Sequence, residues 1–305
     1  MQDPIVEVKD FQKKYGDFPA VRGISFSVER GEIFGLLGPN GAGKTSTLES
    51  LEGLRRPDGG MLRVAGLDPS RQAGQLHNVI GVQLQTSGLP ETISPANAMK
   101  VFCSYHSTPA RMDLLTRLGL DEKKNTQYHE LSTGQKRRLN LALAIAHNPP
   151  VVILDEPTAG LDVASRVELH AVMRELKGNG TTIILATHDM AEAEELSDRV
   201  AILLSGEIVH TGSPMEITAS GSGLTKVSVQ TQDGCFSNSE LSLPGVQQQA
   251  RKENYTIFYT TDIGPTLSAL IANIDAREDV LIDLRVERPS LEDRFLEITH
   301  NGAKP

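Results

Sequence analysis

An eight-residue run near the N-terminus has the residue types and spacing that suit phosphate binding. It fits the pattern G-x-x-x-x-G-K-[ST] and reads Gly38-Pro39-Asn40-Gly41-Ala42-Gly43-Lys44-Thr45. Glycines let successive backbone amides turn toward phosphate oxygens, which larger side chains would keep at a distance. Lys44 can reach the β- and γ-phosphates, and the Thr45 hydroxyl can ligate Mg²⁺. We therefore predict that this run binds the phosphates of a nucleotide.

The elements on either side of this run suit the same chemistry. Residues 33–37 are almost continuously apolar, which is typical of a central strand covered on both faces in a parallel α/β sheet. A helix from about 43 to 51 is expected next, with the positive end of its dipole facing the anion. The alternative is a glycine-rich turn with a solvated lysine. It would explain neither the apolar strand before the run nor the helix expected after it. We expect a strand, a phosphate loop and a helix in that order.

A second apolar run, residues 151–154, ends in two carboxylates, Asp155 and Glu156. In an open α/β sheet the side chains at the carboxyl end of a strand project into the ligand crevice. Asp155 would hold Mg²⁺ through water, and Glu156 would polarise an attacking water as general base. The alternative is that the two carboxylates only mark a solvated strand end, but the presence of the phosphate loop disfavours this interpretation. The pair predicts hydrolysis of the bound nucleotide.

Residues 131–135 read LSTGQ, in which Ser132 and Gln135 have the spacing of a capping box. This spacing predicts the start of a helix. By itself the segment is well explained as a capped helix whose following basic residues face solvent. A helix N-terminus with serine and glycine at its tip is also a second anion site. The residues alone leave both interpretations open.

Taken in order, these motifs resemble those of the ATP-binding cassette (ABC) family, whose LSGGQ-like motif lies between a phosphate loop and an LDE strand. The resemblance covers residues from about 5 to 217. It implies five further roles: adenine stacking by Tyr15, phosphate binding by Ser46, Mg²⁺ sensing by Gln85 (Gln83 is a nearby alternative), a D-loop at Asp162 and γ-phosphate contact by His188. The motif departs from the family at Thr133, where glycine is usual. Since a β-branched residue disfavours positive φ, we expect a slightly stiffer or shifted loop that stays active.

The resemblance also implies a composite site made by two chains. One chain would hold ATP through Tyr15 and the residues from Gly38 to Ser46. Mg²⁺ would lie near Thr45, Gln85 and Asp155, and catalysis would use Glu156, His188 and Gln85. The partner chain would close the site with Ser132, Thr133, Gly134, Gln135 and Asp162. We therefore expect a homodimer that depends on ATP, with ATP and Mg²⁺ as cofactors.

Residues 287–298, ERPSLEDRFLEI, resemble the closing helix of the drug, antibiotic and lipid exporter branch, the ABC-2 type. This resemblance implies an ATPase that powers a separate polytopic permease and exports a hydrophobic or amphipathic compound. An importer subunit is the main alternative. A soluble ABC ATPase acting on ribosomes or DNA is disfavoured, because the chain has one cassette without a long insertion. A nucleotide switch without turnover is disfavoured because Glu156 and His188 are both present.

We predict an α/β fold, with a P-loop ATPase core, an antiparallel β subdomain and an inserted helical subdomain at about 86–147. The glycine- and serine-rich residues 218–224 suggest a boundary between a nucleotide-binding domain, 1–220, and a small α+β accessory domain, 221–305. Apolar residues of the helical subdomain could line a docking groove or pack in its own core: Leu89, Ile93, Met99, Val101, Phe102 and Tyr105.

Composition limits the partners and the compartment. The chain has 305 residues and a net charge of −9, and no stretch concentrates lysine or arginine, so nucleic acid is not an expected partner. It lacks the apolar core of a signal peptide and any apolar run of the roughly 18 residues that a bilayer span needs. We expect a cytoplasmic protein, peripheral on the cytoplasmic face of the cell membrane. Cys103 and Cys235 are expected to be ordinary thiols.

Overall fold

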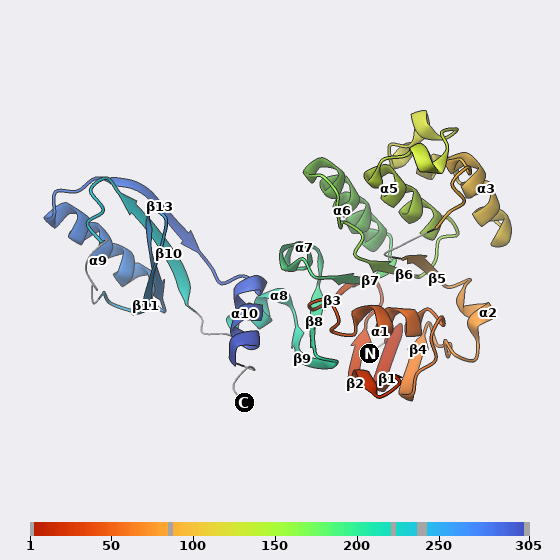
Figure 1. The fold of residues 1–305 in the computed structure, drawn as a ribbon, viewed down its shortest axis with the longest axis horizontal. Coiled ribbons are helices and arrows are strands. Elements are labelled where there is room, and N and C mark those ends of the chain that lie inside the picture. Colours follow the sequence, from red (N-terminus) through yellow and green to blue (C-terminus); the bar gives the residue numbers. More distant parts are fainter. Residues whose placement is uncertain (1–2, 85–87, 221–223, 237–242, 302–305) are drawn as a thin grey trace. The chain divides into compact units, whose positions relative to one another are not determined.

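The computed structural model describes residues 3–84, 88–220, 224–236 and 243–301 of the chain. The chain divides into two compact units, residues 1–214 and 215–305 (Figure 1). The division falls a few residues before the glycine- and serine-rich segment, of which 221–223 lie outside the described residues. The domain boundary at 220 stays a prediction.

The first unit is built on a six-stranded sheet with the order β5-β6-β7-β3-β8-β9. All neighbouring pairs are parallel except the last, β8 with β9. The strands are β3 (Ile33–Leu37), β5 (Ile80–Gln83), β6 (Val151–Asp155), β7 (Thr182–Thr187), β8 (Arg199–Leu204) and β9 (Glu207–Gly212). Every residue of β3, β6 and β7 is buried, and the continuous apolar sequences of β3 and β6 predicted this.

The burial of these central strands on both faces follows from the alternation of side chains along a strand. Val152 and Leu154 of β6 belong to one apolar cluster, which includes the helices of the inserted subdomain. Val151 and Ile153 belong to a second cluster, which includes the antiparallel sheet. Strand β6 thus packs in both apolar clusters, and this packing on both faces fixes the position of its carboxyl end.

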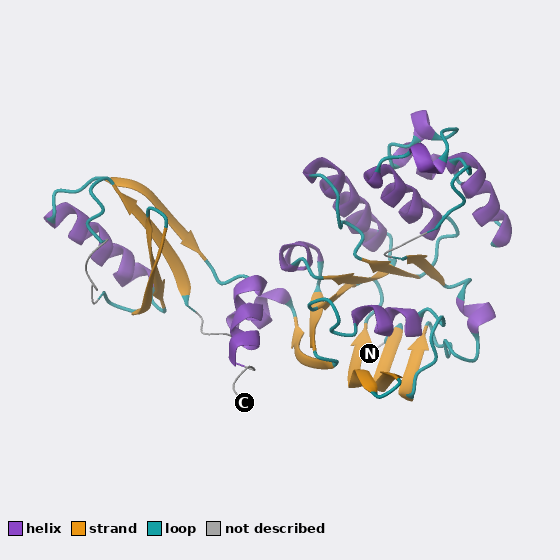
Figure 2. Cartoon of the chain, viewed as in Figure 1, coloured by secondary structure: helices purple, strands orange, loops and turns teal. Residues whose placement is uncertain are grey.

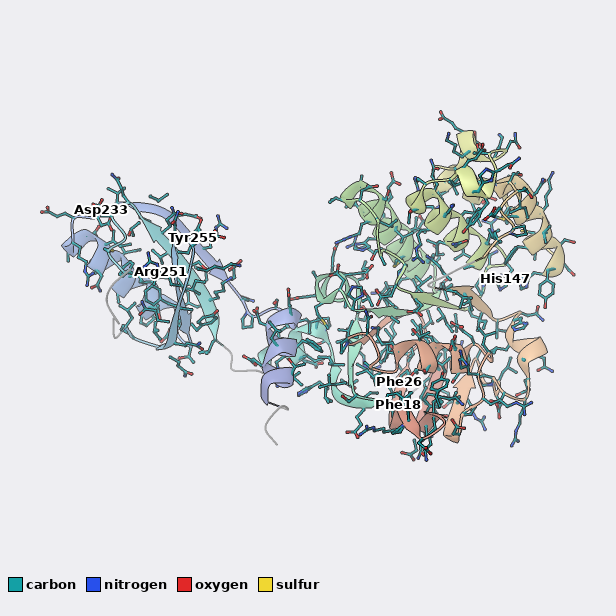
Figure 3. The ribbon with its side chains drawn as sticks, viewed as in Figure 1. Phe18, Phe26, His147, Asp233, Arg251 and Tyr255 are labelled. Carbon is teal, nitrogen blue, oxygen red and sulfur yellow. The ribbon has the colours of Figure 1, made fainter. Side chains whose placement is uncertain are left out.

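A three-stranded antiparallel sheet, β2-β1-β4, forms the second layer of this unit (Figure 2). Its strands are β1 (Val6–Tyr15), β2 (Phe18–Val28) and β4 (Gly59–Val64). In β2, Ile24, Phe26 and Val28 are buried and alternate with more exposed residues, so one face of this strand packs in the core. Phe26 stacks on Phe34 of β3, with 5.1 Å between ring centroids, so this contact ties the two sheets together (Figure 3).

Seven helices complete the first unit. They are α1 (Lys44–Leu51), α2 (Ala73–Leu76), α3 (Pro95–Tyr105), α4 (Met112–Arg117), α5 (Thr133–Ala144), α6 (Val163–Gly178) and α7 (Met190–Leu196) among the described residues. The helices α3, α4 and α5 follow β5 and precede β6, so they form the inserted helical subdomain. Met99, Leu114 and Leu141 are buried in the cluster that they share with the central sheet.

The second unit holds a four-stranded antiparallel sheet with the order β11-β12-β10-β13. Its elements are α8 (Pro214–Ala219), β10 (Thr225–Thr231), β11 (Val246–Lys252), β12 (Tyr255–Thr260), α9 (Ile263–Ala276), β13 (Leu281–Glu287) and α10 (Leu291–Asn301). Helix α10 overlaps residues 287–298, where the sequence resemblance implied a closing helix. Val229, Phe258 and Leu270 pack in its apolar core, which confirms a small α+β fold.

Candidate active site

The phosphate loop adopts a conformation that only its glycines allow. Gly41 and Gly43 have φ of 82° and 107°, in the left-handed region. A Cβ atom at Gly43 would lie 2.7 Å from the carbonyl oxygen of Ala20. The backbone can therefore approach β2 closely and then enter α1, whose first residue is Lys44.

Lys44 is buried and points back over this loop. Its Nζ atom donates hydrogen bonds to the carbonyl oxygens of Gly38, at 2.6 Å, and Pro39, at 3.4 Å. The same atom lies 3.6 Å from Glu156 Oε1. Burial lowers the pKa of Lys44, while Glu156 and Asp155 oppose that shift. A buried cation with two anionic neighbours is well placed to exchange them for phosphate oxygens.

Asp155 and Thr45 together offer oxygen atoms suited to a hard cation. The Thr45 hydroxyl donates to Asp155 Oδ2 at 3.1 Å. Asp155 Oδ1 is buried and has no hydrogen-bond partner among the described residues. Burial raises the pKa of Asp155, and the bond from Thr45 opposes the shift. An orphaned carboxylate oxygen beside a hydroxyl fits Mg²⁺, which takes oxygen ligands.

Glu156 follows Asp155 at the end of β6, and its backbone is in the left-handed region with φ of 50°. Its amide donates to the carbonyl oxygen of Ala186 on β7, which holds this unusual conformation. Its Oε2 atom lies 2.7 Å from His188 Nδ1, just beyond the end of β7. The carboxylate is buried, whereas the His188 side chain is more than half exposed. Glu156 and His188 therefore meet because they follow the carboxyl ends of two neighbouring parallel strands, β6 and β7.

A cavity of about 220 Å³ lies beside the phosphate loop and includes Lys44, Thr45, Asp155 and Glu156 in its lining. Tyr15, at the end of β1, also lines it, and its hydroxyl lies 3.1 Å from Ser46 Oγ. Phe18 lies opposite Tyr15 across the β1–β2 turn and is 61% exposed (Figure 3). The sequence reasoning missed Phe18, although an exposed aromatic residue within three positions of Tyr15 could have signalled it. Two exposed rings can present faces to a nucleobase.

The LSTGQ segment begins helix α5, as its spacing predicted. Ser132 Oγ accepts from the Gln135 amide at 3.2 Å, and Gln135 Oε1 accepts from the Ser132 amide at 3.0 Å. Asp162 caps α6 in the same manner by accepting from the Ser165 amide at 2.9 Å. A Cβ atom at Gly134 would lie 3.2 Å from Ser165 Oγ, so the starts of α5 and α6 lie side by side.

The described part of the chain does not join these two helix starts to the phosphate loop by any hydrogen bond. Neither Ser132 nor Asp162 lines the cavity beside Lys44. Thr133 is the first residue of α5 and does not have positive φ, so the expected conflict between its β-branch and the loop does not arise. Gln85 lies outside the described residues, while Gln83 is the buried last residue of β5.

A buried lysine beside a glycine loop faces two successive carboxylates at the end of β6, one of them paired with a hydroxyl. This is the arrangement of a P-loop nucleoside triphosphatase. The family described as ABC transporter matches residues 21–159 of the chain. The Nod factor export ATP-binding protein I of Burkholderia orbicola (strain AU 1054) is 35% identical over 302 residues, which cover 96% of each chain. The chain therefore belongs to the ABC transporter family as an ATP-binding subunit that hydrolyses ATP.

Another relative and the solved structures agree with this assignment. The daunorubicin resistance ATP-binding protein DrrA3 of Streptomyces coeruleorubidus is 33% identical and covers 98% of this chain and 97% of its own. A structure titled as the ATP-binding subunit of an ABC transporter has a TM-score of 0.66 at 27% identity, covering 70% of this chain and 91% of that one. A dimeric bacterial ABC transporter cassette has a TM-score of 0.63 at 22% identity, covering 68% and 98%, and shares the fold.

Within the described residues, no helix has both the length and the apolarity that crossing a membrane requires.

Proposed function

We propose that this chain is the ATPase subunit of an exporter that moves a hydrophobic or amphipathic compound through a separate membrane permease. The observation that carries the proposal is the complete carboxylate pair beside buried Lys44, in a chain whose relatives bear export and resistance names. Those names do not favour an importer subunit, nor an ATPase acting on ribosomes or DNA. The chain would work on the cytoplasmic face of the cell membrane.

In this proposal, Glu156 accepts the proton of the water that attacks the γ-phosphorus. His188, 2.7 Å away, fixes the orientation of that carboxylate. Because the His188 ring is largely exposed, its other nitrogen is available to the γ-phosphate. Lys44 would leave Glu156 for the phosphates and compensate the charge that develops there. Tyr15 and Ser46 would hold the base and the phosphates.

Mg²⁺ would be held by Thr45 and Asp155, with Gln85 as the third expected contact. When bound, it would neutralise charge on the β- and γ-phosphate oxygens. The Thr45 hydroxyl would turn from Asp155 Oδ2 toward the cation, so the 3.1 Å bond between them is the contact that binding replaces. This exchange leaves neither oxygen buried without a partner.

A second copy of the chain would complete each site. The exposed starts of α5 and α6 carry amide groups and a positive helix end, which attract an anion. Because these elements lack hydrogen bonds to the phosphate loop within the described chain, their Ser132, Gly134 and Asp162 are available to ATP on a partner. ATP would then hold two chains together, and loss of the γ-phosphate would release them. The opening and closing would drive the permease.

The export proposal can be tested with inverted membrane vesicles from the native host. Vesicles from cells with the wild-type chain should accumulate daunorubicin or another amphipathic dye when ATP is added. Vesicles from cells with Glu156→Gln should accumulate roughly a hundredfold less, as expected when a general base is lost. Equal accumulation with and without ATP across a panel of amphipathic compounds, together with solute uptake by whole cells that requires Glu156, would favour the importer alternative.

A further inference from the structure

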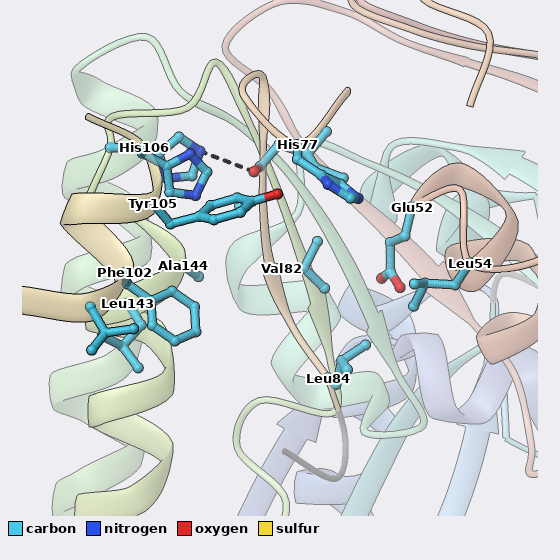
Figure 4. A pocket seen from close by; sticks show the side chains of 14 residues that line it. Glu52, Leu54, His77, Val82, Leu84, Phe102, Tyr105, His106, Leu143 and Ala144 are labelled. Carbon is cyan, nitrogen blue, oxygen red and sulfur yellow. Dashed lines mark hydrogen bonds between the residues drawn. The ribbon is translucent and has the colours of Figure 1, made fainter. Parts of the chain in front are cut away.

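Two glutamates of the first unit, Glu52 and Glu192, are each only 2% exposed. The Oε2 atom of each has no hydrogen-bond partner in the part of the chain that the structure describes. Glu52 lines an apolar cavity with Leu54 and Phe102 (Figure 4). Glu192 instead contacts the segment that follows Glu156. Because burying a carboxylate without partners destabilises a fold, the groups that contact Glu192 must compensate its burial.

Glu192 lies in the first turn of α7 and accepts a hydrogen bond from Thr158. The Thr158 hydroxyl donates to Glu192 Oε1 at 2.7 Å, and both side chains are buried. Thr158 follows Glu156 by two residues, and Glu192 follows His188 by four. The same two segments therefore meet twice, once through the Glu156–His188 contact and once through this buried bond. A second contact restricts the rotation of the segments about the first.

The backbone between the two contacts is short and hydrogen-bonded on both segments. The Ala159 amide donates to the carbonyl oxygen of Glu156 at 3.3 Å, which folds the turn that includes Thr158. On the other segment, the Glu192 amide donates to Asp189 Oδ1 at 3.0 Å, which caps α7 one residue after the active-site histidine. A displacement at the buried bond therefore reaches the catalytic carboxylate and the histidine ring.

Helix α6 contacts the other side of Glu192 through His170, which is 2% exposed. The Nε2 atom of His170 lies 3.4 Å from Glu192 Oε1, and its Nδ1 atom lies 3.3 Å from Glu195 Oε2. A neutral imidazole donates from one nitrogen, whereas the imidazolium form donates to both carboxylates. Arg166 and Arg174, one turn to either side, also pair with acidic residues of the α7 segment. A row of opposite charges thus holds α7 against α6.

We propose that Thr158, Glu192 and His170 are positioning residues for ATP hydrolysis. They hold the Glu156 carboxylate and the His188 ring at a fixed spacing, so the inference rests on the proposed function of that pair. None of the three lines the cavity beside the phosphate loop, among the residues described. Because small displacements of reacting groups lower a rate steeply, loss of the buried bond should lower kcat. ATP binding uses other residues and should change little.

Substitution of Thr158 in the purified full chain tests the buried bond. Thr158→Val removes the hydroxyl at nearly constant volume and should lower kcat about tenfold, with KM for ATP within about twofold of wild type. Thr158→Ser keeps the hydroxyl and should restore kcat. Thr182→Val is the matched control, because it removes a buried hydroxyl that accepts from the Gly31 amide at the opposite end of β7. It should leave kcat unchanged.

The charge pair is tested in the same assay with His170→Gln. This change removes the cation beside Glu192 and should lower kcat about threefold, again with KM unchanged. Arg174→Gln is its control. It removes an exposed cation from the same row, where solvent screens the charge, so kcat should stay at the wild-type value.

A double-mutant cycle with His188→Ala tests whether the buried bond acts through the catalytic pair. His188→Ala alone should lower kcat strongly, and radiolabelled ATP keeps the remaining rate measurable. Adding Thr158→Val should then change kcat by less than about twofold, because the ring whose spacing the bond fixes is gone. A general loss of structural integrity would instead lower kcat by the same factor in both backgrounds.

The possible failures are distinct. Wild-type kcat in Thr158→Val, or an equal loss in Thr182→Val, would overturn the positioning role and leave the proposed mechanism intact. Multiplying effects in the double mutant would show that the bond does not act through the catalytic pair. Wild-type kcat in His188→Ala would instead overturn the proposed mechanism and the positioning role together. None of these assays requires the permease, so their outcome is independent of export.

Discussion

At the scale of single residues, the proposed mechanism makes hydrolysis depend on Glu156. Its buried carboxylate lies between Lys44 and His188, at 3.6 and 2.7 Å. In the proposed mechanism, phosphate binding uses Lys44 and the loop amides, whereas proton acceptance uses the Glu156 carboxylate. The two functions should therefore separate on substitution.

We expect Glu156→Gln to lower the steady-state rate of ATP hydrolysis by about two to four orders of magnitude, the contribution usual for a general base. Binding of a fluorescent ATP analogue should stay within a few-fold of wild type, because glutamine has the same shape. Phosphate release and fluorescence titration measure the two quantities. A near-normal rate of hydrolysis in this variant would show that another group accepts the proton.

His147 gives a second prediction at this scale. Its Nε2 atom lies 3.1 Å from the carbonyl oxygen of Ile80, and its ring stacks on that of His106 at 3.8 Å. Burial lowers the pKa of His147 to about 4, and His106 adds to the shift. The unfolded chain binds a proton at an ordinary histidine pKa, near 6.5, so protonation favours unfolding. This residue therefore contributes stability above about pH 6.5 that is lost as the pH falls toward 4.

Chemical denaturation at pH 7.5 and pH 5 should detect this loss. Because solvent screens a partly exposed ring, we expect His147 to account for about 1–2 kcal/mol of the difference. His147→Gln keeps a donor for the Ile80 carbonyl but does not titrate, so its free energy of unfolding should fall less between the two pH values. An identical fall in both proteins would exclude His147 as the cause.

At the scale of elements, the start of helix α5 has a structural role in capping and a proposed role in ATP binding. The capping box of Ser132 and Gln135 satisfies the first amides of the helix. In the proposed two-chain site, the same helix end binds ATP on a partner chain, so one serine would serve both stability and catalysis. The neighbouring Thr133 lies in the first turn and takes no part in the box.

We expect Ser132→Ala to lower the free energy of unfolding by about 1 kcal/mol through loss of the cap. It should also lower ATP hydrolysis by more than that instability explains, because it removes a donor to the phosphate. Thr133→Gly, a change to the residue usual in the family, should keep hydrolysis close to wild type. Urea denaturation and an ATPase assay at a temperature far below unfolding separate the effects. Full activity in Ser132→Ala would remove this serine from the proposed site.

The strands also show which secondary structure a local sequence pattern can predict and which it cannot. The continuous apolar runs at 33–37 and 151–154 predicted β3 and β6, because a strand buried on both faces needs no polar residue. The pattern failed for β11, whose sequence VQQQARK has little apolar content and whose side chains are mostly exposed or half-buried. Pairing with β12 orders that strand, and pairing is a tertiary interaction that no local pattern contains.

At the scale of the whole molecule, the proposed site requires two chains. The phosphate loop and the helix starts of α5 and α6 lie in one unit without a hydrogen bond between them in the described residues. If ATP joins these two surfaces across a dimer, the time for which ATP stays bound and intact should control the lifetime of the dimer.

We therefore expect Glu156→Gln with ATP and Mg²⁺ to sediment as a dimer, because the bound nucleotide is not consumed. The same variant with EDTA should sediment as a monomer or a much weaker dimer. Lys44→Ala is the matched control, because it should lose nucleotide affinity and with it the dimer. A strictly monomeric Glu156→Gln protein at saturating ATP and Mg²⁺, both alone and with its permease, would contradict the two-chain site.

The sequence by itself determined the local parts of this protein: the glycine loop, the strand that ends in Asp155 and Glu156, and the capped start of α5. These follow from backbone freedom, alternation and capping, which act within a few residues. Only the tertiary structure decided that Lys44 lies against Glu156 and that Phe18 joins Tyr15 beside the phosphate loop. Contacts between distant segments and the removal of water depend on the packing of the whole unit, so no short stretch of sequence specifies them.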